Sequence, residues 1–245
     1  SGHIDALAEK TQNGALLPGT SGIGHTRWAT HGAPTDTNAH PHMSADGKFA
    51  IVHNGIIENY AALRDELKSK GFVFRSETDT EVIVHLLDMY YTGDLKAAVL
   101  HTAARLEGSY ALGVLCADQP GTICAVKMAS PLILGVGVGE NFFASDVTAL
   151  VSHTKNVIYL EDGEFAEITP DSISIYDSTG ATVHRSISRI VWDIEAAEKG
   201  GYEHFMLKEI MEQPRALKAT IAPRIKNGKI VLDDFDEAFR ADFRY

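Results

Sequence analysis

Long hydrophobic runs and clusters of positive charge are both missing from this sequence of 245 residues. No apolar run approaches the roughly 18 residues that a membrane-spanning helix needs, and the N-terminus lacks the basic-then-apolar pattern of a secretory signal. The formal net charge is −11, and lysine and arginine do not cluster, which disfavours binding to nucleic acid or to an anionic membrane. We therefore expect a cytoplasmic protein whose partners are neither nucleic acids nor membranes.

Cysteine is also scarce. The chain has two cysteines, Cys116 and Cys124, on either side of a predicted turn at residues 118–121. A symmetric hairpin would place Cys116 opposite Ile123, so that the two sulfurs would not face each other. We expect two half-buried reduced thiols rather than a disulfide.

Apolar periodicity and turn residues predict an α+β domain. The first half of the chain predicts strands at 23–29 and 49–52 and helices at 59–70, 79–91 and 94–107. Short apolar runs separated by Gly, Pro or Asn then predict strands at 110–117, 123–128, 132–138, 142–144, 157–160, 165–168, 173–176 and 182–185. This combination favours two stacked sheets with helices outside.

The pair Gly200-Gly201 is the best candidate for a domain boundary. Strand signals stop near Glu195, and residues 202–213 predict a helix that Pro214 should break. We therefore expect one domain over residues 1–199 and a separate segment over residues 200–245.

The stretch from Ser21 to Gly55 is rich in hydrogen-bonding side chains. The guanidinium of Arg27 suits a bidentate grip on a carboxylate, although an ordinary salt bridge would use the same residue type. Trp28 offers a flat apolar wall, and Thr30 and His31 offer further donors and acceptors. This pattern is typical of a pocket for a small polar molecule.

Asn54 and Gly55 follow a predicted buried strand, where a side-chain amide and a backbone N–H can point at one atom. Such a pair can stabilise an oxyanion, an effect worth roughly 2.7–4 kcal/mol per donor. Asn-Gly is also a common tight-turn dipeptide. Asp79, at the start of a predicted helix, either caps that helix or accepts a substrate ammonium group. With Arg27, these residues fit an α-amino acid that carries a side-chain carbonyl.

Two other motifs carry less weight. The stretch from Ser21 to Gly55 contains five histidines: His25, His31, His40, His42 and His53. It has no Cys/His framework and no His-x-x-x-His helix, so we expect these histidines to form hydrogen bonds in loops and to bind no metal or other cofactor. The glycine-rich residues 135–139 lack the lysine and the strand-then-helix context of a phosphate-binding loop.

Four segments, in this order and spacing, resemble the glutaminase domain of class II glutamine amidotransferases: GIGHTRWATHG, NAHPH, HNGIIENY and SETDTEV. These enzymes are N-terminal-nucleophile hydrolases. The segments SPLILGVGVGENFFASD and YEHFMLKEIMEQP resemble segments of those family members that aminate fructose 6-phosphate. The resemblance implies a four-layer αββα sandwich of two antiparallel sheets flanked by helices, and hydrolysis of the side-chain amide of glutamine.

The resemblance also implies the roles of single residues. It predicts a glutamine pocket lined by Arg27, Trp28, Thr30, His31, Gly55 and Asp79. Arg27 would bind the carboxylate of glutamine and Asp79 its ammonium group. Asn54 and Gly55 would form the oxyanion hole.

The ends of the chain depart from the family pattern. The family's nucleophile is an N-terminal cysteine whose own α-amino group is the base, whereas this chain begins with Ser1. By the resemblance, roughly 45 residues of the usual start are absent. Residues 1–199 would then be a glutaminase domain lacking its start, and residues 200–245 would be linker helices and the beginning of a sugar isomerase domain. As given, the chain is expected not to hydrolyse glutamine.

The same resemblance implies that the full-length protein is a homodimer. In that protein, the released ammonia would convert fructose 6-phosphate to glucosamine 6-phosphate. Two alternatives stay open. The chain could be a non-catalytic module that binds glutamine, or the amidotransferase could supply a different ammonia acceptor.

Overall fold

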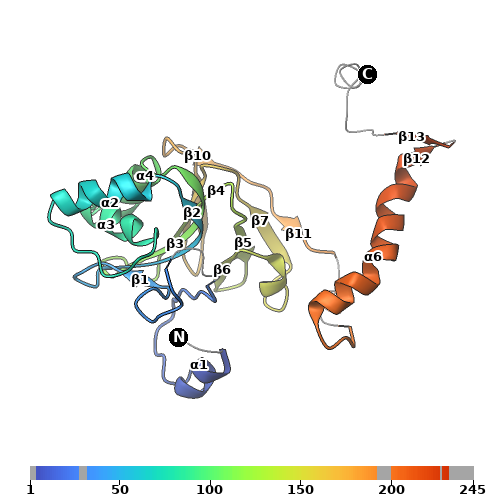
Figure 1. Ribbon diagram of the computed structural model, residues 1–245, viewed down its shortest axis with the longest axis horizontal. Helices are drawn as coiled ribbons and strands as arrows, with labels where there is room; N and C mark the ends of the chain where they lie inside the picture. The colour runs from blue at the N-terminus through green and yellow to red at the C-terminus, as the bar shows by residue number, and fades with distance from the viewer. Residues whose placement is uncertain (1–3, 28–31, 192–199, 227, 232–245) are drawn as a thin grey trace. The chain divides into compact units, whose positions relative to one another are not determined.

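The computed structural model describes residues 4–27, 32–191, 200–226 and 228–231 of the chain. The chain divides into two compact units, Ser1–Val191 and Trp192–Tyr245. The first unit carries helices α1 to α4 and two larger sheets, and the second carries helix α6 (Figure 1). Within the described ranges, no helix combines the length and the apolar character needed to cross a bilayer.

The larger sheet has seven strands, each antiparallel to its neighbours. Their order across the sheet is β1 (His42–Met43), β2 (Phe49–Ile57), β3 (Gly108–Cys116), β4 (Ile123–Met128), β8 (Phe165–Ile168), β9 (Ile173–Tyr176) and β10 (Thr182–Val183). Strands β2 and β3 share the longest pairing, from Phe49 opposite Cys116 to Ile57 opposite Gly108.

The smaller sheet has four antiparallel strands in the order β11 (Ser188–Arg189), β7 (Asn156–Tyr159), β5 (Ile133–Val136) and β6 (Asn141–Ala144). Apolar side chains from both sheets form one buried cluster between them, which includes Ala125 of β4 and Leu134 of β5. The sheets approach so closely that a Cβ atom at Gly113 would lie 2.4 Å from the ring of Phe143. All eight strands predicted from Tyr110 onward are therefore confirmed, with small shifts at their ends.

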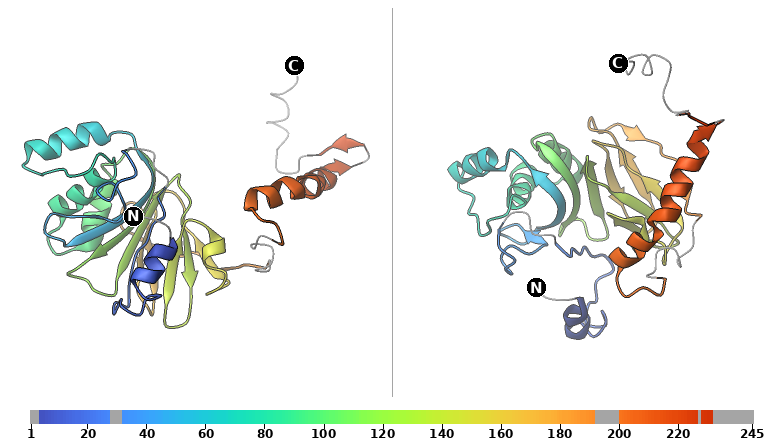
Figure 2. Two further views of the ribbon diagram at one scale, coloured as in Figure 1. Left: turned by 60° about the horizontal axis from the view of Figure 1, so that its bottom comes forward. Right: turned by 45° about the vertical axis from the view of Figure 1, so that its right-hand side comes forward.

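Three helices cover the outer face of the larger sheet: α2 (Tyr60–Ser69), α3 (Glu81–Tyr90) and α4 (Leu95–Ala103) (Figure 2). Helix α2 buries Leu63 and Leu67, one turn apart, as their spacing predicts. The outer face of the smaller sheet packs against the short turn η1 (Val147–Ala149) and the residues that follow it. The expected α+β class, with two stacked antiparallel sheets flanked by helices, is confirmed.

The remaining elements are short or exposed. Helix α1 (Ile4–Lys10) buries no side chain. In the second unit, helix α6 (Phe205–Ile221) is followed by the turn η2 (Ala222–Arg224) and by a hairpin of β12 (Ile225–Lys226) and β13 (Lys229–Ile230).

Several predictions of local structure were wrong. Residues 21–27 form no strand, because His25 and Arg27 are held there by side-chain hydrogen bonds and not by a ladder. Helix α6 continues through Pro214. Proline removes one backbone hydrogen bond, and this largely exposed helix can pair the freed carbonyl with water. The hairpin register places Ile123 opposite Leu115, one residue from the predicted partner, although both cysteines are free and buried.

Candidate active site

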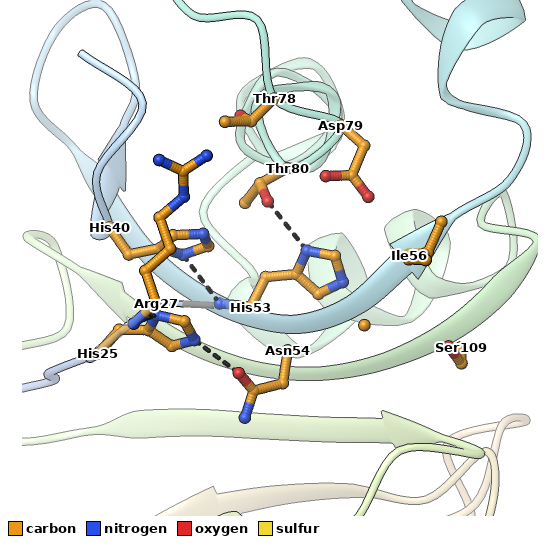
Figure 3. A pocket seen from close by; sticks show the side chains of 11 residues that line it. His25, Arg27, His40, His53, Asn54, Ile56, Thr78, Asp79, Thr80 and Ser109 are labelled. Carbon is orange, nitrogen blue, oxygen red and sulfur yellow. Dashed lines mark hydrogen bonds between the residues drawn. The ribbon is translucent and has the colours of Figure 1, made fainter. Parts of the chain in front are cut away.

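A cavity of about 270 Å³ lies beside strand β2 (Figure 3). Strand β1 pairs only with Ala50 and Ile51 of β2, and the cavity lies along the same edge of β2 beyond that pairing. Eleven residues line it: His25, Arg27, His40, His53, Asn54, Gly55, Ile56, Thr78, Asp79, Thr80 and Ser109. The fold thus brings four predicted site residues to one cavity: Arg27, Asn54, Gly55 and Asp79. In the sequence these residues are spread over more than fifty positions.

The backbone of β2 directs N–H groups toward this cavity. The N–H of His53 donates to Nδ1 of His40 at 3.2 Å, and the N–H of Ile57 donates to Oδ2 of Asp79 at 2.8 Å. Alternate residues of an antiparallel strand point their N–H groups to the same edge. The N–H of Gly55 therefore points to the same edge, between these two bonds and into the cavity.

Gly55 is fixed by the close approach of β2 and β3. Its φ is +126°, and a Cβ atom there would lie 2.0 Å from the carbonyl oxygen of Ser109. Only glycine fits such a position. Asn54 and Gly55 lie inside β2, which continues to Ile57, and not in a tight turn. The sequence prediction, which placed these two residues at or after the end of the strand, was wrong.

Asn54 is half-buried, and its side-chain oxygen Oδ1 lies 2.6 Å from Nε2 of His25. Nδ1 of the same imidazole accepts a hydrogen bond of 2.8 Å from the backbone N–H of Arg27. One imidazole therefore joins the segment that carries Arg27 to the strand that carries Asn54.

Arg27 brings a guanidinium group to the cavity. Its Nη2 atom donates to the carbonyl of Gly32 at 3.0 Å, and its Nη1 atom donates to the carbonyl of Ala33 at 3.1 Å. The backbone of Arg27 is left-handed, with φ of +42°. Of the other predicted pocket residues, Trp28, Thr30 and His31 lie outside the described residues.

Asp79 is held at the cavity by the turn before α3. The carboxylate of Glu81 accepts hydrogen bonds of 2.7 Å from the N–H groups of Arg75 and Ser76, and one of 2.6 Å from the Ser76 hydroxyl. Burial opposes ionisation of Glu81, but hydrogen bonds from His85, Ser76 and the backbone lower its pKa to about 2. Glu81 is the first residue of α3.

Two histidines of the cavity, His40 and His53, are uncharged at neutral pH. Burial lowers the pKa of His40 to about 2, and the neighbouring histidines and Arg27 act in the same direction. Burial also lowers the pKa of His53 to about 4, against the opposing influence of Asp79. Nδ1 of His53 lies 2.9 Å from the hydroxyl of Thr80. These histidines were expected in hydrogen-bonded loops, but His53 lies within β2.

Neither cysteine belongs to the cavity lining that the structure describes. Cys116 and Cys124 lie in the apolar cluster between the larger sheet and its helices. Burial raises the pKa of the Cys124 thiol, so this group is not an activated nucleophile. Thr78, Thr80 and Ser109 also line the cavity, and the sequence pattern gave no separate signal for their hydroxyl groups.

Comparisons with known proteins identify relatives of this chain. Over 236 residues the chain is 52% identical to the glutamine–fructose-6-phosphate aminotransferase (isomerizing) of Caldanaerobacter subterraneus subsp. tengcongensis, covering 96% of this chain and 39% of that protein. The corresponding protein of Aquifex aeolicus is 55% identical over 201 residues, covering 82% of this chain and 34% of that protein. The chain therefore spans well under half the length of these relatives.

The fold is similar to that of glutamine phosphoribosylpyrophosphate amidotransferase from B. subtilis, with a TM-score of 0.52 and 26% identity over 63% of this chain and 34% of that chain. The family model described as a glutamine amidotransferase domain matches residues 10–221. With this match over most of its length, the chain belongs to the glutamine amidotransferase domain family.

Proposed function

We propose that the cavity beside β2 binds glutamine and that the chain is the ammonia-releasing part of a glutamine–fructose-6-phosphate aminotransferase. The observation that carries this proposal is the placement of a carboxylate, a guanidinium, an amide and a strand N–H around one cavity of about 270 Å³. The names of the relatives support fructose 6-phosphate as the ammonia acceptor. The product would be glucosamine 6-phosphate.

The two charged residues suit the two charged ends of an amino acid. We assign the α-carboxylate to Arg27, whose planar guanidinium can donate two parallel hydrogen bonds. We assign the α-ammonium group to Asp79, which is buried and uses Oδ2 for the N–H of Ile57, leaving Oδ1 for the substrate. In the same proposal, Trp28, Thr30 and His31 complete the pocket.

The amide and the strand N–H suit the reacting carbonyl. Attack on the side-chain amide of glutamine places negative charge on its oxygen. The N–H of Gly55 and the side-chain Nδ2 group of Asn54 are two donors on consecutive residues that can stabilise this charge, at roughly 2.7–4 kcal/mol each. When this intermediate collapses, the C–N bond breaks, the nitrogen takes up a proton and leaves as ammonia, and the acyl group stays on the attacking nucleophile. Water then cleaves this acyl-enzyme bond, which releases glutamate and restores the nucleophile.

No cysteine lines the part of the cavity that the structure describes. We propose an N-terminal cysteine with its α-amino group as base, carried by sequence other than these 245 residues. Residues 1–199 would be the glutaminase domain, and residues 200–245 the linker helices and the start of a sugar isomerase domain. The full-length protein would be a cytoplasmic homodimer.

The test compares the full-length gene product with the 245-residue chain. The full-length protein should release ammonia from glutamine and form glucosamine 6-phosphate from fructose 6-phosphate. The 245-residue chain should release none. A folded full-length protein without glutamine-dependent ammonia release would exclude the proposal, and tight glutamine binding without hydrolysis would favour a non-catalytic module. Ammonia release without glucosamine 6-phosphate would indicate a different acceptor.

A further inference from the structure

The imidazole of His25 connects the two ends of the proposed glutamine site. We propose that His25 is a positioning residue that sets the orientation of the Asn54 amide, a role that rests on the proposed function. His25 touches Asn54 on one side and the backbone of Arg27 on the other (Figure 3). It would act on the reaction through these two residues and not through the substrate.

The hydrogen bonds of His25 fix the position of its proton. The backbone N–H of Arg27 can only donate, so Nδ1 of His25, at 2.8 Å, is the acceptor and carries no proton. In a neutral imidazole the proton then lies on Nε2. Nε2 therefore donates to the side-chain atom of Asn54 that lies 2.6 Å away, and this atom is the oxygen Oδ1.

The orientation of the Asn54 amide follows from this donation. An asparagine amide has two nearly isosteric ends, an accepting oxygen and a donating nitrogen, and its terminal torsion is soft. Because Nε2–H of His25 selects the oxygen, the NH₂ end of Asn54 is the one left for another acceptor. An amide turned the other way would present an oxygen to the developing oxyanion and would repel it.

The backbone beside His25 is strained in a way that supports this role. Arg27 has φ of +42°, a left-handed conformation that residues with a side chain rarely adopt. The bond from its N–H to Nδ1 of His25 spans only two residues and closes a turn around that conformation. The fold therefore maintains an unfavourable backbone geometry at the point where His25 meets Arg27.

A second histidine holds the ring of His25 in place. The rings of His25 and His40 are stacked, with centroids 4.3 Å apart and planes 25° apart. His40 is itself attached to β2, because its Nδ1 accepts the N–H of His53. The plane of the His25 ring is thus set by the strand that carries Asn54.

Two substitutions separate the two bonds of His25. In H25N the side-chain oxygen can replace Nδ1 and keep the turn at Arg27, but nothing replaces the donor to Asn54. In H25Q the side-chain NH₂ reaches the place of Nε2 and keeps that donor, but the acceptor for Arg27 is lost. An exposed histidine outside the site, changed in H184A, is the matched control.

The assay is glutamine-dependent ammonia release by the full-length gene product. We expect H25N to lower kcat about 10- to 100-fold with little change in KM, because the lost orientation acts on the transition state. H25Q should keep kcat within about threefold and raise KM, and H184A should change neither. In the N54A background, H25N should cause no further loss of kcat, because the group it positions is gone.

Two outcomes would overturn the inference while leaving the proposed function intact: an active H25N with kcat close to that of the wild type, or a full further loss from H25N in the N54A background. If the wild-type protein releases no ammonia, the proposed function fails instead. The imidazole is then examined by long-range ¹H–¹⁵N spectra of the 245-residue chain. A protonated Nε2 in His25 would support the hydrogen-bond assignment, and a protonated Nδ1 would contradict it.

Discussion

The Oδ2 atom of Asp79 accepts a hydrogen bond of 2.8 Å from the backbone N–H of Ile57. Asp79 lies two residues before the first residue of α3, and this bond ties it to the edge of β2 at Ile57, two positions from Gly55. Asp79 is only 3% exposed, so its carboxylate serves the fold as well as the cavity. Any test of its role in binding has to separate these two contributions.

The variant D79N makes that separation. Its amide oxygen can still accept the N–H of Ile57, so we expect the midpoint of thermal unfolding to change little. The negative charge is lost, and a charge-assisted hydrogen bond is worth about 1.5–3 kcal/mol, so KM for glutamine should rise about 10- to 100-fold. Steady-state kinetics of the full-length gene product measure this. D79A, which also removes the acceptor for Ile57, should lower the unfolding midpoint, and equal effects of both variants on KM and stability would contradict the two-part role.

Gly55 should tolerate no side chain. In G55A the new Cβ atom would lie 2.0 Å from the carbonyl oxygen of Ser109, at a φ of +126°. We expect a loss of at least about 2 kcal/mol in the free energy of unfolding, measured by urea denaturation. The control is G121A, where φ is +84° but no atom lies within 4 Å of the added Cβ, and the loss should be about 1 kcal/mol. Equal losses would show that the close approach of β2 and β3 has no energetic consequence.

Arg27 and Asn54 should affect different kinetic constants of the full-length gene product. R27A removes the contact that we propose for the α-carboxylate of glutamine, so KM should rise about 10- to 100-fold with kcat nearly unchanged. N54A removes the proposed oxyanion donor, which would matter most in the transition state, so kcat should fall about 100-fold or more with a small change in KM. The exposed Arg189 on β11 supplies a control, R189A. An unchanged kcat in N54A would count against the oxyanion role of Asn54.

The strands of this fold were predictable where local signals are strong. Strands β4, β8 and β9 have the same bounds in the structure as in the sequence prediction, because their apolar runs end at turn residues on both sides. The segment before Arg27 was not predictable in the same way. Its one apolar residue, Ile23, lies between Gly22 and Gly24. The side chain of His25 in this segment bonds to Asn54, 29 positions away.

The candidate site was predictable as a set of residue types but not as a geometry. Arg27, Asn54, Gly55 and Asp79 have the chemistry of amino-acid recognition, and they do line one cavity. The bond between His25 and Asn54 joins residues 29 positions apart, and no local pattern indicates it. Likewise, an Asn-Gly pair predicts a turn, and only the pairing with β3 shows why this glycine is required inside a strand.

The uncharged histidines predict that acid destabilises the first unit. The pKa of His53 is lowered from 6.5 in the unfolded chain to about 4 in the folded one. Between these pH values the unfolded state binds a proton that the folded state does not, so stability is present above pH 6.5 and is lost as the pH falls. His53 alone should lower the free energy of unfolding by about 1.4 kcal/mol per pH unit between about pH 6 and 4. His40, with its pKa lowered to about 2, acts in the same direction.

Urea denaturation at pH 7, 6 and 5 measures this loss. In H53N, where an uncharged amide can still reach the hydroxyl of Thr80, the slope of stability against pH should be smaller than in the wild type. The exposed His184 provides the comparison, since H184N should keep the wild-type slope. An unchanged slope in H53N would mean that His53 is protonated in the folded protein as readily as in the unfolded one. Burial of the imidazole beside Thr80 argues against that result, because ionisation there would place a charge in a site that excludes water.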